Sequence, residues 1–243
     1  MAFFVGGISC LTALALSMKA IELERDAEFL KSAPRVKQLR DLRQLLDAEK
    51  SPLVVAVSGR VVSKTPIECQ MSRLSGVIVE ERLEELNLHK KVATEQEMKS
   101  NDDDDSWTLR TKMISSIPKE VPWFLDDETD RVRVVGARGA TGFELPAENT
   151  TLETLGNRMR EKTIGFKRIE WVLPVGTSLN VVGEASKDDA GTIWIQRPPK
   201  GPFYVSCKTI DEHATDLAKS SSWRMATSAC MTGFGAWCLF SLL

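Results

Sequence analysis

Histidine and cysteine are scarce in this sequence. Among 243 residues there are two histidines, His89 and His213, and five cysteines. No Cys-x-x-Cys pair occurs, and only Cys69 and Cys207 lie in the charged body of the chain. A structural zinc site takes four Cys or His ligands, so we predict no metal and no cofactor in this chain. The two body cysteines favour free thiols over a single disulfide bridge.

The usual motifs of nucleotide binding and hydrolysis are also missing. There is no Gly-Lys-Ser/Thr of a P-loop and no Gly-x-Ser-x-Gly elbow. Gly136, Gly139 and Gly142 follow a strand-like run, but their spacing differs from the dinucleotide fingerprint and favours a structural loop. The acidic run 99–106 (KSNDDDDS) lacks the spaced ligands of a calcium loop and predicts a solvated loop. We therefore predict no catalytic residue.

The chain carries no excess of positive charge. It has 32 Lys plus Arg against 34 Asp plus Glu, for a net charge of -2. Binding to a phosphate backbone needs a basic face, so nucleic acid is not an expected partner.

Both ends of the chain lack charge altogether. All charged side chains lie between Lys19 and Arg224, and the runs 2–18 and 225–243 have none. As helices these runs would be about 26 and 28 Å long, near the thickness of a bilayer core. We predict two transmembrane helices, and the membrane as a partner. Their apolar and aromatic anchors are Phe3, Phe4, Leu11, Leu14, Leu16, Trp223, Phe234, Trp237 and Phe240.

A secreted, lipid-anchored protein is an alternative to this topology. The first run would then be a cleaved signal, the second a removed GPI-attachment tail, and Asn149 a glycosylation site. No basic region follows Met1, and the polar spacer before the second run is only Trp223-Arg224, so two membrane spans are favoured.

The charged middle predicts a β-rich domain. Residues 22–49 have the apolar spacing of a helix that ends at Ser51-Pro52, and residues 152–162 indicate a short helix. Thr209 and Glu212 form a capping box that opens a last helix. Residues 188–192 indicate a hairpin turn. Strands, mostly antiparallel, are expected over 53–62, 76–86, 106–117, 130–137, 168–174, 178–185 and 192–198.

The predicted fold class is α+β, a β-rich domain between two transmembrane helices. The corresponding segments are 1–18, 19–50 as a membrane-proximal helix, 51–222 as the domain, and 223–243.

One loop stands out as a candidate recognition surface. The run VPWFLDD (121–127) places two aromatic side chains between a proline and two aspartates, and arginines follow that can pair with the acids. The plainer interpretation is a loop that packs its aromatic side chains into the core, and both remain open. The candidate substrate-recognition residues are Trp123, Phe124, Asp126, Asp127, Arg131 and Arg138.

Several segments resemble a known family. VAVSGRV (55–61), GVIVEE (76–81), VPWFLDD (121–127), RVRVVGARGATGF (131–143), the long run 168–198 and KGPFYVS (200–206) are similar to the GIDE, or "beside a membrane", domain. That domain belongs to RING-type E3 ubiquitin ligases of organelle outer membranes (MULAN/MAPL-like), and the plant chloroplast-envelope members are the most similar.

The resemblance implies a location and a role. The GIDE domain would lie in the intermembrane space (residues 51–222 here) between two outer-membrane helices, and would contact substrates for protein ubiquitination and organelle organisation. The expected location is a multi-pass protein of an organelle outer membrane, with the chloroplast outer envelope favoured over the mitochondrial outer membrane. Expected partners are envelope proteins such as protein-import components.

The resemblance also assigns ubiquitin transfer to a zinc-binding RING. Its Cys/His ligands have no counterpart in this sequence, so the chain is not expected to transfer ubiquitin alone. A non-enzymatic adaptor or dominant-negative partner, which forms homo- or hetero-oligomers with full-length ligases, is the alternative.

Overall fold

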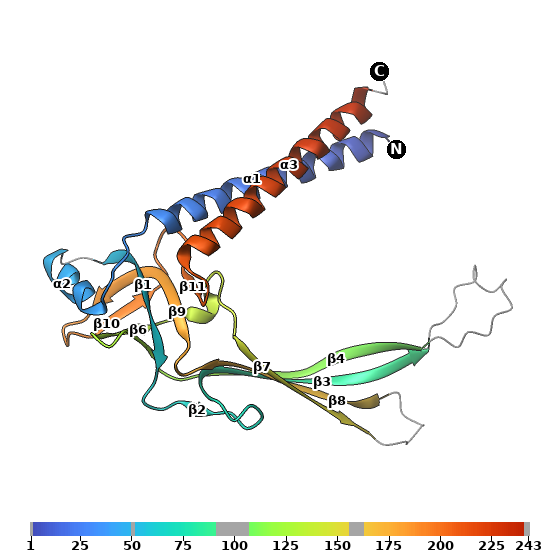
Figure 1. Cartoon of the computed structure of the whole chain (residues 1–243). Coiled ribbons are helices and arrows are strands. Elements are labelled where there is room, and N and C mark those ends of the chain that lie inside the picture. The colour runs from blue at the N-terminus through green and yellow to red at the C-terminus, as the bar shows by residue number, and fades with distance from the viewer. Residues whose placement is uncertain (1, 50–51, 91–106, 156–162, 241–243) are drawn as a thin grey trace. The chain divides into compact units, whose positions relative to one another are not determined.

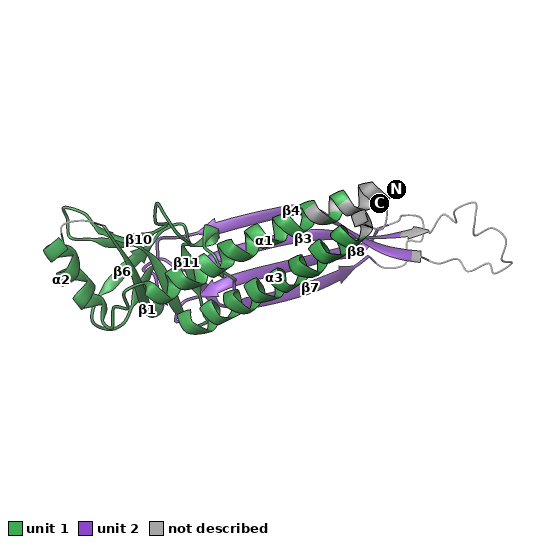
Figure 2. Ribbon diagram, turned by 90° about the horizontal axis from the view of Figure 1, so that it is seen from above, with its two compact units in different colours: residues 1–60, 124–144, 178–243 green, residues 61–123, 145–177 purple. Residues whose placement is uncertain are grey.

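The computed structural model describes the whole chain except residues 1, 50–51, 91–106, 156–162 and 241–243. The described residues form two compact units. Unit 1 comprises residues 1–60, 124–144 and 178–243, and unit 2 comprises residues 61–123 and 145–177 (Figure 2). Each unit is described by itself below.

Unit 1 contains a sheet that closes on itself. Its strands are β1 (Leu53–Val62), β5 (Phe124–Asp126), β6 (Arg131–Val134), β10 (Ile193–Gln196), β9 (Ser178–Lys187) and β11 (Tyr204–Ser206). They pair in that order, and β1 also pairs with β9, from Leu53 opposite Ala185 to Arg60 opposite Ser178. The pairings of β1 with β9, β9 with β10, β9 with β11 and β5 with β6 are antiparallel, and that of β6 with β10 is parallel. Buried aliphatic side chains come from each of its longer strands, with Val57, Leu125, Val132, Val181 and Ile195 at most 1% exposed.

Gly59 has a specific role in this closure. The sequence predicts a bulge at this residue, but its pairing with Leu179 is in regular register. A Cβ at Gly59 would lie 3.1 Å from the backbone oxygen of Asp126. The glycine therefore allows close approach between the backbones of β1 and β5.

Two long helices of unit 1, α1 (Ala2–Ser32) and α3 (Ile210–Phe240), lie side by side and antiparallel (Figure 1). On the face where the two helices meet, a small side chain recurs every seven residues. In α1 these are Ala13, Ala20 and Ala27, and in α3 Ala214, Ser221 and Ser228, each at most 6% exposed. Small residues let the two backbones approach closely, so Ser221 Oγ donates to Ala20 O at 2.9 Å and Ser228 Oγ to Ala13 O at 2.7 Å.

The base of this helix pair packs on the closed sheet. Leu30 of α1 and Ile210 of α3 join Ala56, Val182 and Tyr204 in one buried cluster. The capping box expected at the start of α3 is present, because Glu212 N–H donates to Thr209 Oγ1 at 3.2 Å and Thr209 N–H to Glu212 Oε2 at 2.9 Å.

The two helices were predicted to be transmembrane, and this prediction is wrong. Within the described residues, no helix combines the length and the apolar character needed to cross a bilayer. α1 is charged from Lys19 onward, and serine, threonine and glycine interrupt the uncharged part of both helices. The α+β class remains, but the expected placement between two transmembrane helices and the multi-pass location in an organelle outer membrane are both contradicted.

The predicted anchor residues are placed accordingly. The side chains of Leu11, Leu14, Trp223, Phe234 and Trp237 are exposed on the outer faces of the pair. Leu16 is half-buried. The structure does not describe the side chains of Phe3, Phe4 and Phe240.

The helix expected over 22–49 is interrupted. α1 ends at Ser32, and a separate helix, α2, covers Leu39–Glu49. Pro34 explains the break, because proline disfavours helical backbone at the residue before it and has no N–H to donate.

Unit 2 is built on a second sheet. Its strands are β2 (Ile67–Glu68), β3 (Ser75–Lys90), β8 (Thr163–Pro174) and β7 (Ala147–Thr154), in that order, and β4 (Trp107–Glu120) pairs with the other side of β3. The register of β3 with β4 shifts by one residue between Leu83 and Glu84. A small core of Cys69, Val79 and Val172 lies near the start of β3. Residues 152–154 of the expected helix are strand, and 156–162, like the acidic loop 99–106, lie outside the described residues.

Candidate protein-recognition sites

The two aromatic residues of the VPWFLDD loop point inward. Trp123, the last residue of the first segment of unit 2, has a side chain 1% exposed, and its Nε1 donates to Glu120 Oε1 at 3.3 Å. Phe124 begins β5 in unit 1 and is half-buried opposite Arg133. Both aromatic side chains therefore serve packing in this structure.

Asp126 and Asp127 organise the turn that follows β5. Arg131 Nε donates to Asp126 Oδ2 at 2.5 Å, and Glu128 N–H donates to Asp126 Oδ1 at 2.7 Å. Glu128 has a φ of 72°, in the left-handed region that few non-glycine residues adopt. Asp126 therefore stabilises this turn through Oδ1, while its Oδ2 is bound by Arg131.

Asp127 joins the turn to helix α2. Its Oδ2 accepts the Leu39 N–H at 2.7 Å, so it caps a helix 88 residues away in sequence. Its Oδ1 accepts the N–H and hydroxyl of Thr129 at 2.9 and 2.6 Å. Partial burial alone would raise the pKa of the Asp127 carboxyl, but these hydrogen bonds outweigh it and hold the pKa below its usual value.

Asp130 fixes the same helix from its side. Arg43 of α2 donates through Nε to Asp130 Oδ2 at 2.8 Å and through Nη1 to Gly191 O at 2.7 Å. The hydrogen bond from Arg43 lowers the pKa of Asp130, and burial opposes this less strongly. Sequence reasoning missed Asp130 and Arg43, because partners so far apart in sequence leave no local pattern.

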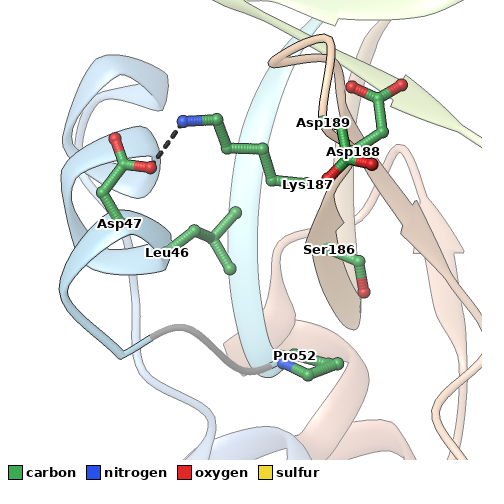
Figure 3. Close-up of a pocket in the computed structure, with 7 residues that line it drawn as sticks. All are labelled: Leu46, Asp47, Pro52, Ser186, Lys187, Asp188 and Asp189. Carbon is green, nitrogen blue, oxygen red and sulfur yellow. Dashed lines mark hydrogen bonds and ion pairs between the residues drawn. The ribbon is translucent and has the colours of Figure 1, made fainter.

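Two hollows of unit 1 flank this turn and α2. One, of about 310 Å³, is lined by Ser58, Gly59, Arg60, Asp126, Asp127, Glu128, Ser178, Leu179 and Asn180. The other, of about 440 Å³, is lined by Leu46, Asp47, Pro52, Ser186, Lys187, Asp188 and Asp189. In Figure 3, Lys187 reaches from β9 to Asp47 of α2, with Nζ 2.5 Å from Oδ1. Asp188 closes the hairpin predicted over 188–192 by accepting the Thr192 N–H.

The remaining predicted residue is Arg138. It belongs to the 3-10 helix Ala137–Gly139 and is exposed. Gly136 before it has a φ of 74°, as a structural loop requires. Of the six predicted residues, Trp123 is buried and Arg138 is exposed.

His213 of α3 stacks on Tyr204, with ring centroids 4.4 Å apart, and Cys207 is nearby in sequence. Burial lowers the pKa of His213, which favours the neutral ring, and partial desolvation raises the pKa of the Cys207 thiol although that residue is exposed. Within the described residues, no three His, Cys, Asp or Glu side chains are grouped to hold a metal ion.

Unit 2 offers a different kind of surface, which sequence reasoning did not single out. β4 pairs with β3 alone among the described strands, so its other edge is unpaired. Leu109, Met113, Ile114 and Ile117 of this strand are 54%, 62%, 48% and 49% exposed. The alternation of basic and apolar residues in 109–114 is the signal that indicates such an edge.

Comparison with known proteins identifies the class. The family model described as GIDE, E3 ubiquitin ligase, matches residues 93–239. The chain is 45% identical over 228 residues to E3 ubiquitin-protein ligase SP1 of Arabidopsis thaliana, covering 89% of this chain and 63% of that protein. It is 36% identical over 233 residues to E3 ubiquitin-protein ligase SPL1 of the same plant, covering 91% and 65%. No solved structure matches it significantly.

The class these matches define is that of E3 ubiquitin ligases. This chain belongs to the GIDE family, as its sequence motifs predicted. It spans less than two thirds of the length of either Arabidopsis relative.

Proposed function

We propose that this chain provides a substrate-recognition part of an E3 ubiquitin ligase and acts in protein ubiquitination. The observation that carries the proposal is the GIDE match over residues 93–239, together with relatives whose names state E3 ubiquitin-protein ligase activity. The match includes β4 with its unpaired edge and the turn of Asp126 and Asp127.

The geometry supports recognition as the role of these residues. The turn after β5 is held by Arg131 and by the capped helix α2, so it presents a preorganised surface. The β4 edge presents backbone donors and acceptors that no described strand engages. Proteins that the ligase modifies, with import components of an organelle envelope as candidates, are the partners this proposal names.

Reconstituted ubiquitination tests the proposal. The purified chain is added in excess to the Arabidopsis SP1 ligase with ubiquitin, activating enzyme, conjugating enzyme and a substrate of that ligase. A recognition part competes for substrate, so substrate modification should fall while self-modification of the ligase stays constant. If substrate modification stays unchanged at a saturating concentration of the purified protein, the recognition role is contradicted. If the purified protein forms polyubiquitin without the SP1 ligase, its role extends to ubiquitin transfer.

A further inference from the structure

The side chains of β4 differ in character between the two faces of the strand. Because side chains alternate across a strand, Arg110 and Lys112 share one face of β4 and Leu109, Thr111 and Met113 share the other. The register agrees, since Lys112 lies opposite Glu85 and Met113 opposite Glu84. The edge is thus basic on one face and largely apolar on the other.

Both cations are available to a partner. Lys119, farther along β4, pairs with Glu81 at 2.7 Å, but no ion pair or side-chain hydrogen bond joins Arg110 or Lys112 to another described residue. Glu85, opposite Lys112, instead accepts the hydroxyl of Thr163 at 2.7 Å. Exposed cations next to exposed aliphatic side chains favour an occupant that offers both acids and apolar residues.

A second copy of the same edge fits poorly. Pairing β4 with β4 would bring two basic strands together, and like charges across strands are destabilising. The register shift and Pro118 also interrupt the regular ladder that such self-pairing uses. Basic residues, a bulge and a proline are the devices by which edge strands avoid pairing with copies of themselves.

The opposite edge of the sheet, β7, is a weaker candidate. It is shorter, 8 residues against 14, and its charged side chains are Glu148 and Glu153. It lacks the free cations that give β4 a preference for one kind of partner.

We propose that β4 docks an extended segment of a substrate protein in which acidic residues alternate with apolar ones. The segment adds to the sheet beside β4 through backbone hydrogen bonds. Its acids face Arg110 and Lys112, and its apolar side chains cover Leu109 and Met113. This inference rests on the proposed function for the identity of the partner as a substrate, but the binding itself is testable without ubiquitin.

Fluorescence anisotropy with synthetic peptides tests this docking on the full chain. The probe is a labelled Val-Glu repeat of about ten residues, which matches the alternation of β4. The controls are a Val-Lys repeat of equal length and a Val-Glu repeat with N-methylated alternate amides, which cannot complete the ladder. Only the unmodified acidic peptide should bind, and binding should weaken as salt rises.

Charge reversal on the chain gives the matched comparison. Arg110→Glu with Lys112→Glu should weaken binding of the acidic peptide about tenfold and favour the basic one. Lys64→Glu with Lys200→Glu makes the same change in net charge at two exposed residues that form no side-chain hydrogen bond or ion pair with another described residue, and should leave binding unchanged. Circular dichroism of each variant confirms that the fold is kept.

Three results would overturn the docking proposal. These are equal binding of the acidic and basic peptides, equal binding of the N-methylated peptide, or concentration-dependent self-association in sedimentation that Arg110→Glu abolishes. If the peptide binds as expected but the chain fails to compete for ligase substrate, the docking edge stands and the proposed function fails.

Discussion

Asp127 satisfies backbone donors of two segments at once, and this explains why a local reading of VPWFLDD was incomplete. The sequence shows two acids beside two aromatics, a pattern that suits either recognition or packing. The structure adds that Asp127 accepts the N–H of Leu39, a contact between residues far apart in the chain. Such a carboxylate stabilises the fold while it shapes the surface, because each donor it accepts would otherwise be unpaired.

Replacing Asp127 should therefore loosen α2. Asp127→Ala removes the cap of α2 and the acceptor for Thr129, and should lower the free energy of unfolding by about 1–3 kcal/mol. Asp127→Asn keeps one acceptor oxygen and should cost less. Urea unfolding at pH 7 measures both, with the exposed Glu49→Ala as the control, and equal stability of Asp127→Ala and wild type would exclude the capping role.

The same residue makes stability depend on pH in a defined direction. The pKa of Asp127 is lowered in the folded protein, so its contribution is complete above the ordinary aspartate pKa of about 3.8 and is lost as pH falls through the folded value. The stability difference between wild type and Asp127→Ala should therefore be constant near neutral pH and shrink below about pH 4. A difference that grows on acidification would contradict the assigned direction.

At the scale of elements, most of the longer strands were predicted, but β2, β5, β7 and β11 were not. Runs rich in β-branched residues placed β1 and β9 correctly, because such side chains favour extended backbone and pack well on a buried sheet. The helix ends depended on long-range contacts or on proline, so the separation of α1 from α2 at Pro34 was missed. The charge-free ends predicted membrane spans, but absence of charge also suits two helices that pack closely through alanine and serine.

The close packing of α1 against α3 can be tested at their contact face. Ala20 is 0% exposed and its carbonyl accepts the Ser221 hydroxyl, so Ala20→Leu should force the helices apart. We expect a loss of about 1–3 kcal/mol from overpacking. Ala15→Leu makes the identical change at an exposed position of the same helix and should be nearly neutral. Thermal unfolding followed by circular dichroism compares the stability of the two variants. Equal losses of stability would show that the contact face of the two helices is not close-packed.

At the scale of the whole molecule, two compact units share one chain that crosses between them repeatedly. No sequence pattern predicts this division, because β1 and the run from Trp123 to Phe124 each contain residues of both units. The pattern of expected helices and strands predicted the α+β class, and the motifs predicted the family. The free edge of β4 and the α2 cap needed the structure, since both depend on which strands and turns meet.

Separate cores predict that a local opening in unit 2 stays local. Glu170, 1% exposed, accepts the Ser72 N–H and hydroxyl at 3.1 and 2.6 Å and the Met71 N–H at 3.3 Å, which holds the 69–74 loop over the sheet. Cys69 in that loop is 7% exposed, and burial, with the nearby charge of Glu170, raises the pKa of its thiol.

Glu170→Ala should release this loop and expose Cys69. Alkylation of Cys69 by a thiol reagent should speed up at least about tenfold, because the open loop exposes the thiol and the substitution removes the charge of Glu170. Cys207 in unit 1 is already exposed and serves as the internal control, whose rate should not change. Mass spectrometry of the labelled peptides gives both rates from one sample. Parallel acceleration at both cysteines would mean that the units open together, because only global unfolding changes the environment of both thiols.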